Sequence, residues 1–201
     1  MAAAPSPIEH ILEPELPICD PHHHLRDFPH SRYLLPQLLA DVQSGHNVQS
    51  TVFVECTSFY RASGPDELRF VGETEFVNGA AAMAASGLYG KTLACAGIVS
   101  TAELLAGADV GRVLDAHAMA GGARFKGIRR STSFDHDPDV LGPLARNPAG
   151  VMMEPQFREG VAEVVPLQAG ANLVSNAGRR VQQIETFLRE RIENNDRGHD
   201  V

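Results

Sequence analysis

The chain has few basic residues and no cluster of them. Its 17 Lys and Arg residues stand against 25 Asp and Glu residues, which gives a formal net charge of −8 at pH 7. Proteins that bind nucleic acids neutralise phosphates with clustered Lys and Arg side chains. The composition therefore argues against a nucleic-acid partner.

Long apolar runs are also missing. No stretch approaches the roughly 20 apolar residues that a membrane-spanning helix needs, so we expect no membrane partner. The first residues, MAAAPSPIEHILEPELP, contain neither the charged start nor the apolar stretch of about 7 to 15 residues that mark a secretion signal. These absences favour a cytoplasmic protein.

Cysteine is scarce. The three cysteines, Cys19, Cys56 and Cys95, are widely separated, and each lies inside an apolar run. An odd number at such spacing does not suggest a disulfide framework, so we predict three reduced residues in the core.

What the chain does contain is an alternation of two patterns. Four short apolar or β-branched runs are predicted strands, and three stretches rich in Ala and Leu between them are predicted helices. The strands cover residues 16–20, 51–56, 93–99 and 124–128, and the helices cover residues 34–44, 73–85 and 109–118. Nearly continuous apolarity marks strands that are buried on both faces. Strands that alternate with helices indicate βαβ units and a parallel sheet, so the fold class is α/β.

The last seventy or so residues follow this pattern poorly. We predict a short strand at residues 151–154, a weak apolar run at 161–167, and an amphipathic helix that starts at Ser175 or Asn176, has its last apolar residue at Ile192 and is followed by a polar tail. We expect this helix to pack on the core. The predicted organisation is an extension at residues 1–15, a βα region at 16–160, and a divergent C-terminal segment with helix and polar tail at 161–201.

The loop after the second predicted strand, SFYRASGPDELRFVG, is longer than the usual strand-to-helix connection of about 2 to 6 residues. Long loops at this position often carry function. Tyr60 and Arg61 in this loop are therefore candidates for substrate contact, with simple solvent exposure as the alternative.

The segment CDPHHHL at the end of the first predicted strand is the most informative in the chain. Residues two apart in an extended segment point to the same side, so His22 and His24 can project together while His23 faces away. Paired imidazoles suit a divalent metal or a hydrogen bond to an anionic oxygen. Asp20 could orient one of them. The alternative is a solvated turn of three histidines.

Other polar residues receive more ordinary interpretations. Glu55, which ends the second predicted strand, either points into the site or is a paired structural carboxylate. Glu73 is typical of the first turn of a helix, where a carboxylate favours the positive end of the dipole. His117 falls on a predicted helix and is interpreted as structural.

The run LPICDPHHHLRD resembles the first strand of the amidohydrolase superfamily, in particular the amidohydrolase-related group of metal-dependent hydrolases that contains the 2-pyrone-4,6-dicarboxylate and sugar-lactone lactonases. The stretches SGHNVQSTVFVEC, FYRASGPDELRFVGETEFVNG, CAGIVS and GGARFKGIRRSTSFDHDPDVL resemble the same group. Together they span about residues 16–160 and correspond to the N-terminal half of such enzymes.

The resemblance implies a (β/α)8 TIM barrel, here incomplete, with four to five parallel strands and flanking helices. It also implies hydrolysis of a lactone or similar carbonyl compound. His22 and His24 match the group's HxH pair, as metal ligands or as catalytic groups. Arg129 matches the position that contacts an anionic substrate group, and its guanidinium would pair with a carboxylate; a surface ion pair is the alternative. A divalent metal, zinc or manganese, and metal-free chemistry both remain open.

The chain departs from the group after residue 160. The later strands of such enzymes supply a further histidine and an aspartate, whereas here His199, Asp196 and Asp200 lie in the polar tail. Whether the chain is an enzyme therefore stays open. One alternative is a catalytically inactive half barrel that binds metal or a partner chain, and another is a metal-binding βα domain unrelated to lactones. The uncovered sheet edge of a half barrel also favours a homo-oligomer.

Overall fold

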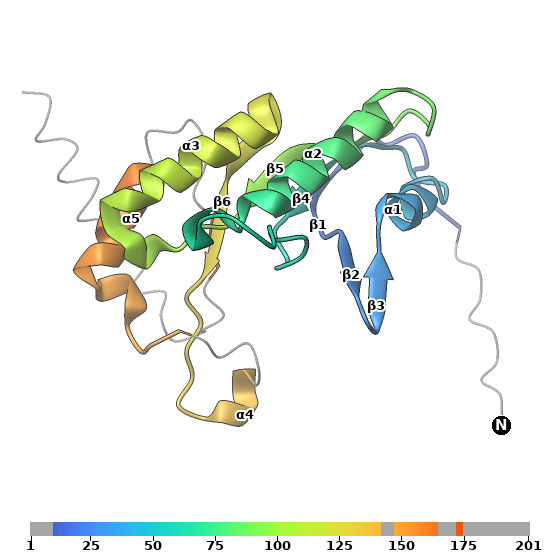
Figure 1. Ribbon diagram of the computed structural model, residues 1–201. Helices are drawn as coiled ribbons and strands as arrows, with labels where there is room; N and C mark the ends of the chain where they lie inside the picture. Colours follow the sequence, from blue (N-terminus) through green and yellow to red (C-terminus); the bar gives the residue numbers. More distant parts are fainter. Residues whose placement is uncertain (1–9, 142–146, 165–171, 175–201) are drawn as a thin grey trace, which may run out of the picture. The chain divides into compact units, whose positions relative to one another are not determined.

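The computed structural model describes residues 10–141, 147–164 and 172–174 (Figure 1). The chain falls into two compact units. Unit 1 consists of Met1–Ser100 and Asp115–Lys126, and unit 2 consists of Thr101–Leu114 and Gly127–Val201. The amphipathic helix predicted after residue 175 lies outside the described residues, as does the end of the apolar run predicted at 161–167.

The four predicted strands are confirmed. In unit 1, β1 (Ile18–His23), β4 (Val48–Val54) and β5 (Leu93–Ser100) pair in parallel in that order, and β6 (Phe125–Ser131) begins here with its first two residues. The fold is mixed α/β, and β1, β4, β5 and β6 are successive neighbours in one sheet. The first strand extends to His23, so His22 and His23 belong to the strand and His24 follows it directly.

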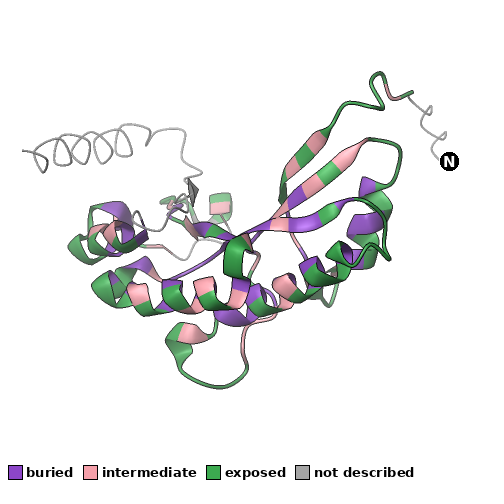
Figure 2. Cartoon of the chain, turned by 90° about the horizontal axis from the view of Figure 1, so that it is seen from above, coloured by how far each residue is buried: buried purple, intermediate pink, exposed green. Residues whose placement is uncertain are grey.

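Helices α1 (Leu35–Val42), α2 (Val71–Ala85) and α3 (Val110–Gly121) confirm the three predicted helices. The buried residues of α1 are spaced by three or four positions, which makes one apolar face. Figure 2 shows buried residues on the strands and helices, whereas the segment before β1 and the connecting loops are largely exposed. The core of unit 1 contains Leu25, Leu35, Leu38, Leu39, Val42, Phe53, Val77, Ala80, Ala81, Ala84, Ala94, Cys95 and Ile98.

A short hairpin after β1 was not predicted. Strands β2 (Arg26–Phe28) and β3 (Ser31–Tyr33) pair in antiparallel register. The Arg26 guanidinium donates to the Ser31 hydroxyl at 2.7 Å and lies 5.8 Å from the centre of the Tyr33 ring. Strands of three residues are too short for an alternating pattern to identify them.

Unit 2 contains short helices around the rest of β6. These are η2 (Leu104–Asp109), α4 (Pro138–Leu141), η5 (Val151–Met153) and α5 (Pro155–Val164), and β7 (Asn172–Val174) pairs in parallel with β6. The strand predicted at 151–154 is wrong. Gly150, with φ 72°, turns the chain into η5, and Pro155 then begins α5, a position at which its missing N–H costs nothing.

Helix α5 packs closely on η2 through a glycine. A Cβ atom at Gly160 would lie 2.3 Å from the carbonyl oxygen of Leu104, so only glycine permits this approach. Phe157 and Val161 on the same helix are buried.

The cysteine prediction is correct in one respect and wrong in another. All three cysteines are free. Cys95 is buried as predicted, Cys56 is half-buried, and Cys19 is exposed. The prediction fails for Cys19 because β1 is the edge strand of the described sheet. The helices among the described residues include none that is both long and apolar enough to cross a membrane.

Candidate functional site

The first strand brings His22 and His24 together, as the alternation of an extended segment predicts. Their ring centres are 4.9 Å apart and the ring planes are nearly perpendicular, at 88°. His22 is exposed and His24 is half-buried, so the pair is accessible from solvent. It lies at the carboxyl end of β1, the end at which parallel βα folds build their sites.

A main-chain carbonyl fixes the tautomer of His24. Its Nδ1 atom lies 2.8 Å from the carbonyl oxygen of Val54, the last residue of β4. Because a carbonyl oxygen only accepts hydrogen bonds, Nδ1 must carry the proton, and in the neutral ring Nε2 then carries the lone pair. Metal-binding and proton-accepting histidines are commonly oriented by such a second bond. This feature could not be seen in the sequence, since the acceptor is a backbone atom.

Asp20 acts on the main chain of the histidine segment. One of its carboxylate oxygens accepts a hydrogen bond from the backbone N–H of His22 at 3.1 Å. The sequence had suggested that Asp20 orients an imidazole ring. The observed bond instead fixes the backbone at the start of the pair.

His23 points to the opposite side, as predicted, and is buried there. Its Nε2 atom lies 2.8 Å from the Thr51 hydroxyl and 3.8 Å from the Cys95 thiol. Its Nδ1 atom has no hydrogen-bond partner among the described residues. Burial lowers the pKa of His23 to about 4, with a smaller opposing effect from the charge of Asp20. His23 is therefore a neutral core residue at physiological pH.

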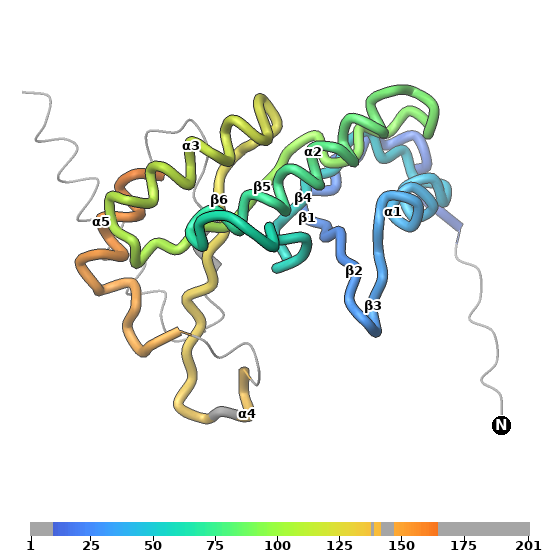
Figure 3. The backbone as a smooth tube through the Cα atoms, in the orientation of Figure 1, coloured from blue at the N-terminus to red at the C-terminus, as the bar shows by residue number. Residues whose placement is uncertain are grey.

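The long loop between β4 and α2 (residues 55–70, teal in Figure 3) is attached to the first turns of α2. One carboxylate oxygen of Glu73, Oε1, accepts main-chain hydrogen bonds from Cys56 at 3.2 Å and from Ser58 at 2.8 Å. Glu73 is only 1% exposed, and burial raises its pKa to about 7. Its first-turn position agrees with the sequence interpretation, but its role in holding the loop was missed, because that role depends on burial and on backbone partners.

The loop residues Tyr60 and Arg61 are both ordered by contacts within unit 1. The Tyr60 ring packs edge-on against Phe70, with 5.2 Å between ring centres. Arg61 makes an ion pair with Glu75 through two guanidinium nitrogens. This hydrogen-bonded pair raises the pKa of Arg61 and lowers that of Glu75. Substrate contact by Tyr60 and Arg61 stays a prediction.

Arg129 belongs to unit 2. It lies on β6 with a half-buried side chain, and its carbonyl oxygen accepts a hydrogen bond from the Thr101 hydroxyl at 2.9 Å. The next residue, Arg130, forms an ion pair with Glu103. Because the histidine pair lies in unit 1, a single site that unites Arg129 with His22 and His24 stays a prediction.

Glu55 and His117, two further polar residues considered in the sequence, are both buried. Glu55 is buried directly after β4, and its N–H donates to the carbonyl oxygen of Val99 at 2.8 Å. His117 is fully buried, and its Nδ1 lies 2.8 Å from the Thr74 hydroxyl, which in turn lies 2.6 Å from that of Ser100. The structural interpretation of His117 fits this buried chain.

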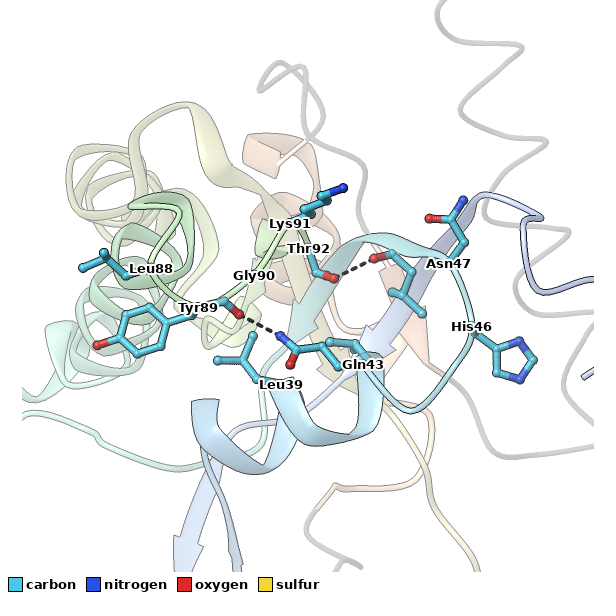
Figure 4. A pocket seen from close by; sticks show the side chains of 11 residues that line it. Leu39, Gln43, His46, Asn47, Leu88, Tyr89, Gly90, Lys91 and Thr92 are labelled. Carbon is cyan, nitrogen blue, oxygen red and sulfur yellow. Dashed lines mark hydrogen bonds between the residues drawn. The ribbon is translucent and has the colours of Figure 1, made fainter. Parts of the chain in front are cut away.

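One pocket in unit 1 lies at the opposite end of the strands, where α1 ends and β4 begins (Figure 4). Its volume is about 630 Å³, and none of the predicted site residues lines it. The amide of Gln43 donates to the Tyr89 carbonyl oxygen and the Thr92 hydroxyl to that of Val48, both at 2.7 Å. These two polar groups therefore join α1, β4 and the segment before β5. The ring of His46 points away from them in Figure 4.

Metal binding by His22 and His24 stays a prediction. Within the described ranges, no group of three or more His, Cys, Asp or Glu side chains has an arrangement that could hold a metal ion. The two imidazoles alone would supply part of a coordination shell. A comparison of the chain with protein-family models, curated proteins and solved structures found no match to any of them.

Proposed function

We propose that the chain is a half-barrel hydrolase of the amidohydrolase-related group and acts on a lactone or a similar small carbonyl substrate. The observation that carries this proposal is the His22–His24 pair at the end of β1, with His24 oriented by the Val54 carbonyl oxygen. Four parallel strands with flanking helices are also what the first half of a (β/α)8 barrel contains.

Two versions of the chemistry fit the pair. The Nε2 lone pair of His24 and the ring of His22 would hold a divalent ion, zinc or manganese, which when bound polarises a carbonyl group. In the metal-free version, Nε2 of His24 takes a proton from the attacking water. The oxygen of that water bonds to the ester carbon, the ring C–O bond breaks, and the leaving oxygen takes the proton back from Nε2, which releases a hydroxy acid and restores the neutral ring.

We assign substrate recognition to three cationic or polar side chains. The guanidinium of Arg129 would bind a carboxylate in bidentate fashion. Tyr60 and Arg61 would contact the substrate from the β4–α2 loop. Arg61 retains N–H groups beyond the two that bond Glu75, since a guanidinium has five.

The alternative is a half barrel without catalytic activity that binds metal or a partner chain. It is supported by the small number of ligands around His22 and His24 within the described part of the chain. The outer edge of β1 has no strand beside it among the described residues, and an open edge favours association with a second copy. The three free cysteines are consistent with a reducing, cytoplasmic compartment.

Light scattering combined with a lactone-hydrolysis panel, with and without zinc or manganese, distinguishes these functions. The hydrolase proposal predicts a defined oligomer with turnover. A defined assembly that binds metal but hydrolyses no lactone would support the alternative. A monomer that neither binds metal nor turns over lactones would contradict both.

A further inference from the structure

The β4–α2 loop begins beside the histidine pair. Val54, which orients His24, is the last residue of β4, and the Cys56 thiol donates to the carbonyl oxygen of Leu25 at 3.2 Å. The loop then carries Tyr60 and Arg61. The start of the loop is therefore attached to the segment that carries the histidine pair.

This conformation is strained at two positions. Thr57 and Phe59 have positive φ angles of 64° and 57°, a region that residues with a Cβ atom rarely adopt. Thr57 is β-branched, for which this region is most unfavourable. Such a backbone persists only where surrounding contacts hold it in place.

Helix α2 supplies those contacts along its first two turns. Glu73 accepts the N–H groups of Cys56 and Ser58, on either side of Thr57. The Phe59 ring stacks on Phe76, with 3.8 Å between centres and 20° between planes.

Gly72 brings the loop and the helix into direct contact. A Cβ atom there would lie 2.5 Å from the Phe59 carbonyl oxygen and 2.6 Å from the Arg61 nitrogen. The Arg61 N–H also donates to the carbonyl oxygen of Arg69 at 3.0 Å. Residues of α2 therefore contact Cys56, Ser58 and Phe59 around the strained turn.

We propose that Glu73 is a positioning residue, whose buried carboxyl group holds the backbone of Cys56 and Ser58 and so fixes the conformation of the loop that carries Tyr60 and Arg61. The consequence for substrate binding rests on the proposed function. The effect on the loop does not.

The second carboxyl oxygen of Glu73 shows that this group differs from a solvent-exposed carboxylate in the first turn of a helix. Oε2 is buried and has no hydrogen-bond partner among the described residues. The titratable groups that face this carboxyl are Glu55, whose charge also raises its pKa, and the Cys56 thiol, 3.7 Å from Oε1. A neutral carboxyl group keeps one carbonyl oxygen as an acceptor. Glutamine at this position keeps the same acceptor, whereas leucine fills a similar volume without one.

Amide hydrogen exchange, followed by NMR on the full chain, tests the effect on the loop. In Glu73→Leu we expect the amides of Cys56 and Ser58 to exchange at least about tenfold faster than in the wild type, because each loses its acceptor. In Glu73→Gln both should stay within about threefold of the wild type. The Glu55 amide, bonded to the Val99 carbonyl oxygen, is the internal control and should not change.

Unchanged protection of Cys56 and Ser58 in Glu73→Leu would overturn the proposal. Equal acceleration at the Glu55 amide would also overturn it, because Glu73 would then support the whole fold and not the loop. The Glu73→Gln variant guards against a misfolded Leu variant, since it must retain protection if the acceptor is what matters.

A kinetic measurement tests the consequence for substrate. In a chain that turns over a lactone, Glu73→Leu should raise KM by a larger factor than it lowers kcat, and Glu73→Gln should restore most of the loss. An unchanged KM in Glu73→Leu would refute the positioning role. Absence of turnover in the wild type would refute the proposed function, whereas the exchange experiment would still decide the role of Glu73.

Discussion

Acidification should destabilise the protein through His23, a residue outside the candidate site. The imidazole is 8% exposed and lies against Thr51, Cys95 and Phe53. A protonated ring would need an acceptor at Nδ1, and none is present among the described residues. The folded state therefore resists protonation, whereas an unfolded chain accepts the proton freely.

The magnitude follows from the pKa of His23, which burial lowers from 6.5 to about 4. As pH falls below 6.5, the unfolded chain binds a proton that the folded chain excludes, so stability falls until about pH 4. A difference of about 2.5 pKa units corresponds to a loss of about 3 kcal/mol over this interval.

Glu73 has the opposite dependence. Burial raises its pKa from 4.5 to about 7, so the folded chain keeps a proton that the unfolded chain releases. Stability attributable to Glu73 therefore falls as pH rises from 4.5 to about 7, again by about 3 kcal/mol. In the wild type the two effects oppose each other between pH 4.5 and 6.5.

The free energy of unfolding, measured with urea at several pH values between 4.5 and 7, would separate the contribution of His23 from that of Glu73. His23→Gln keeps an acceptor for the Thr51 hydroxyl but does not titrate, so its stability should fall as pH rises. Glu73→Gln should show the reverse, with stability that rises with pH. His30→Gln, at an exposed turn, is the control for the substitution itself. If all variants kept the slope of the wild type, the reasoning from burial would be refuted.

Two further predictions concern the β4–α2 loop and the cysteines. Gly72→Ala should lower the free energy of unfolding by about 1 to 3 kcal/mol, because the added Cβ atom would clash with the loop backbone. Gly79→Ala on the same helix, where a Cβ atom meets nothing within 4 Å, should raise it by up to about 1 kcal/mol. Equal melting temperatures of the two variants would contradict this reasoning. Thiol labelling at pH 8 should modify exposed Cys19 first, because burial raises the pKa of Cys56 to about 11 and of Cys95 to about 12. Faster labelling of Cys95 than of Cys19 would count against the described packing.

Four strands of the larger sheet and the three α-helices of the first 130 residues could be predicted because their signals are local, whereas the β2–β3 hairpin was missed. Apolar runs with β-branched residues became β1, β4, β5 and β6, and the stretches rich in Ala and Leu became α1, α2 and α3. The strand prediction at residues 151–154 failed although the segment is apolar. The segment lies between Gly150, which favours a turn, and Pro155, which favours a helix start.

The candidate site was predictable only in its side chains. Alternation along an extended strand was enough to pair His22 with His24. The partner that orients His24 is a backbone oxygen 30 positions away. Every residue has such an oxygen, so the sequence does not indicate which one His24 contacts. The role of Glu73 likewise depends on two backbone amides and on burial, so its sequence position revealed only a helix start.

The central claim is that the imidazole pair carries lactone hydrolysis. The most direct test is the initial rate of hydrolysis on a lactone panel, with and without zinc or manganese, for the wild type, His22→Ala, His24→Ala and His23→Gln. The account predicts a loss of roughly a hundredfold or more in kcat/KM for the two alanine variants and a change of less than about threefold for His23→Gln. Equal rates in the wild type and both alanine variants would contradict it.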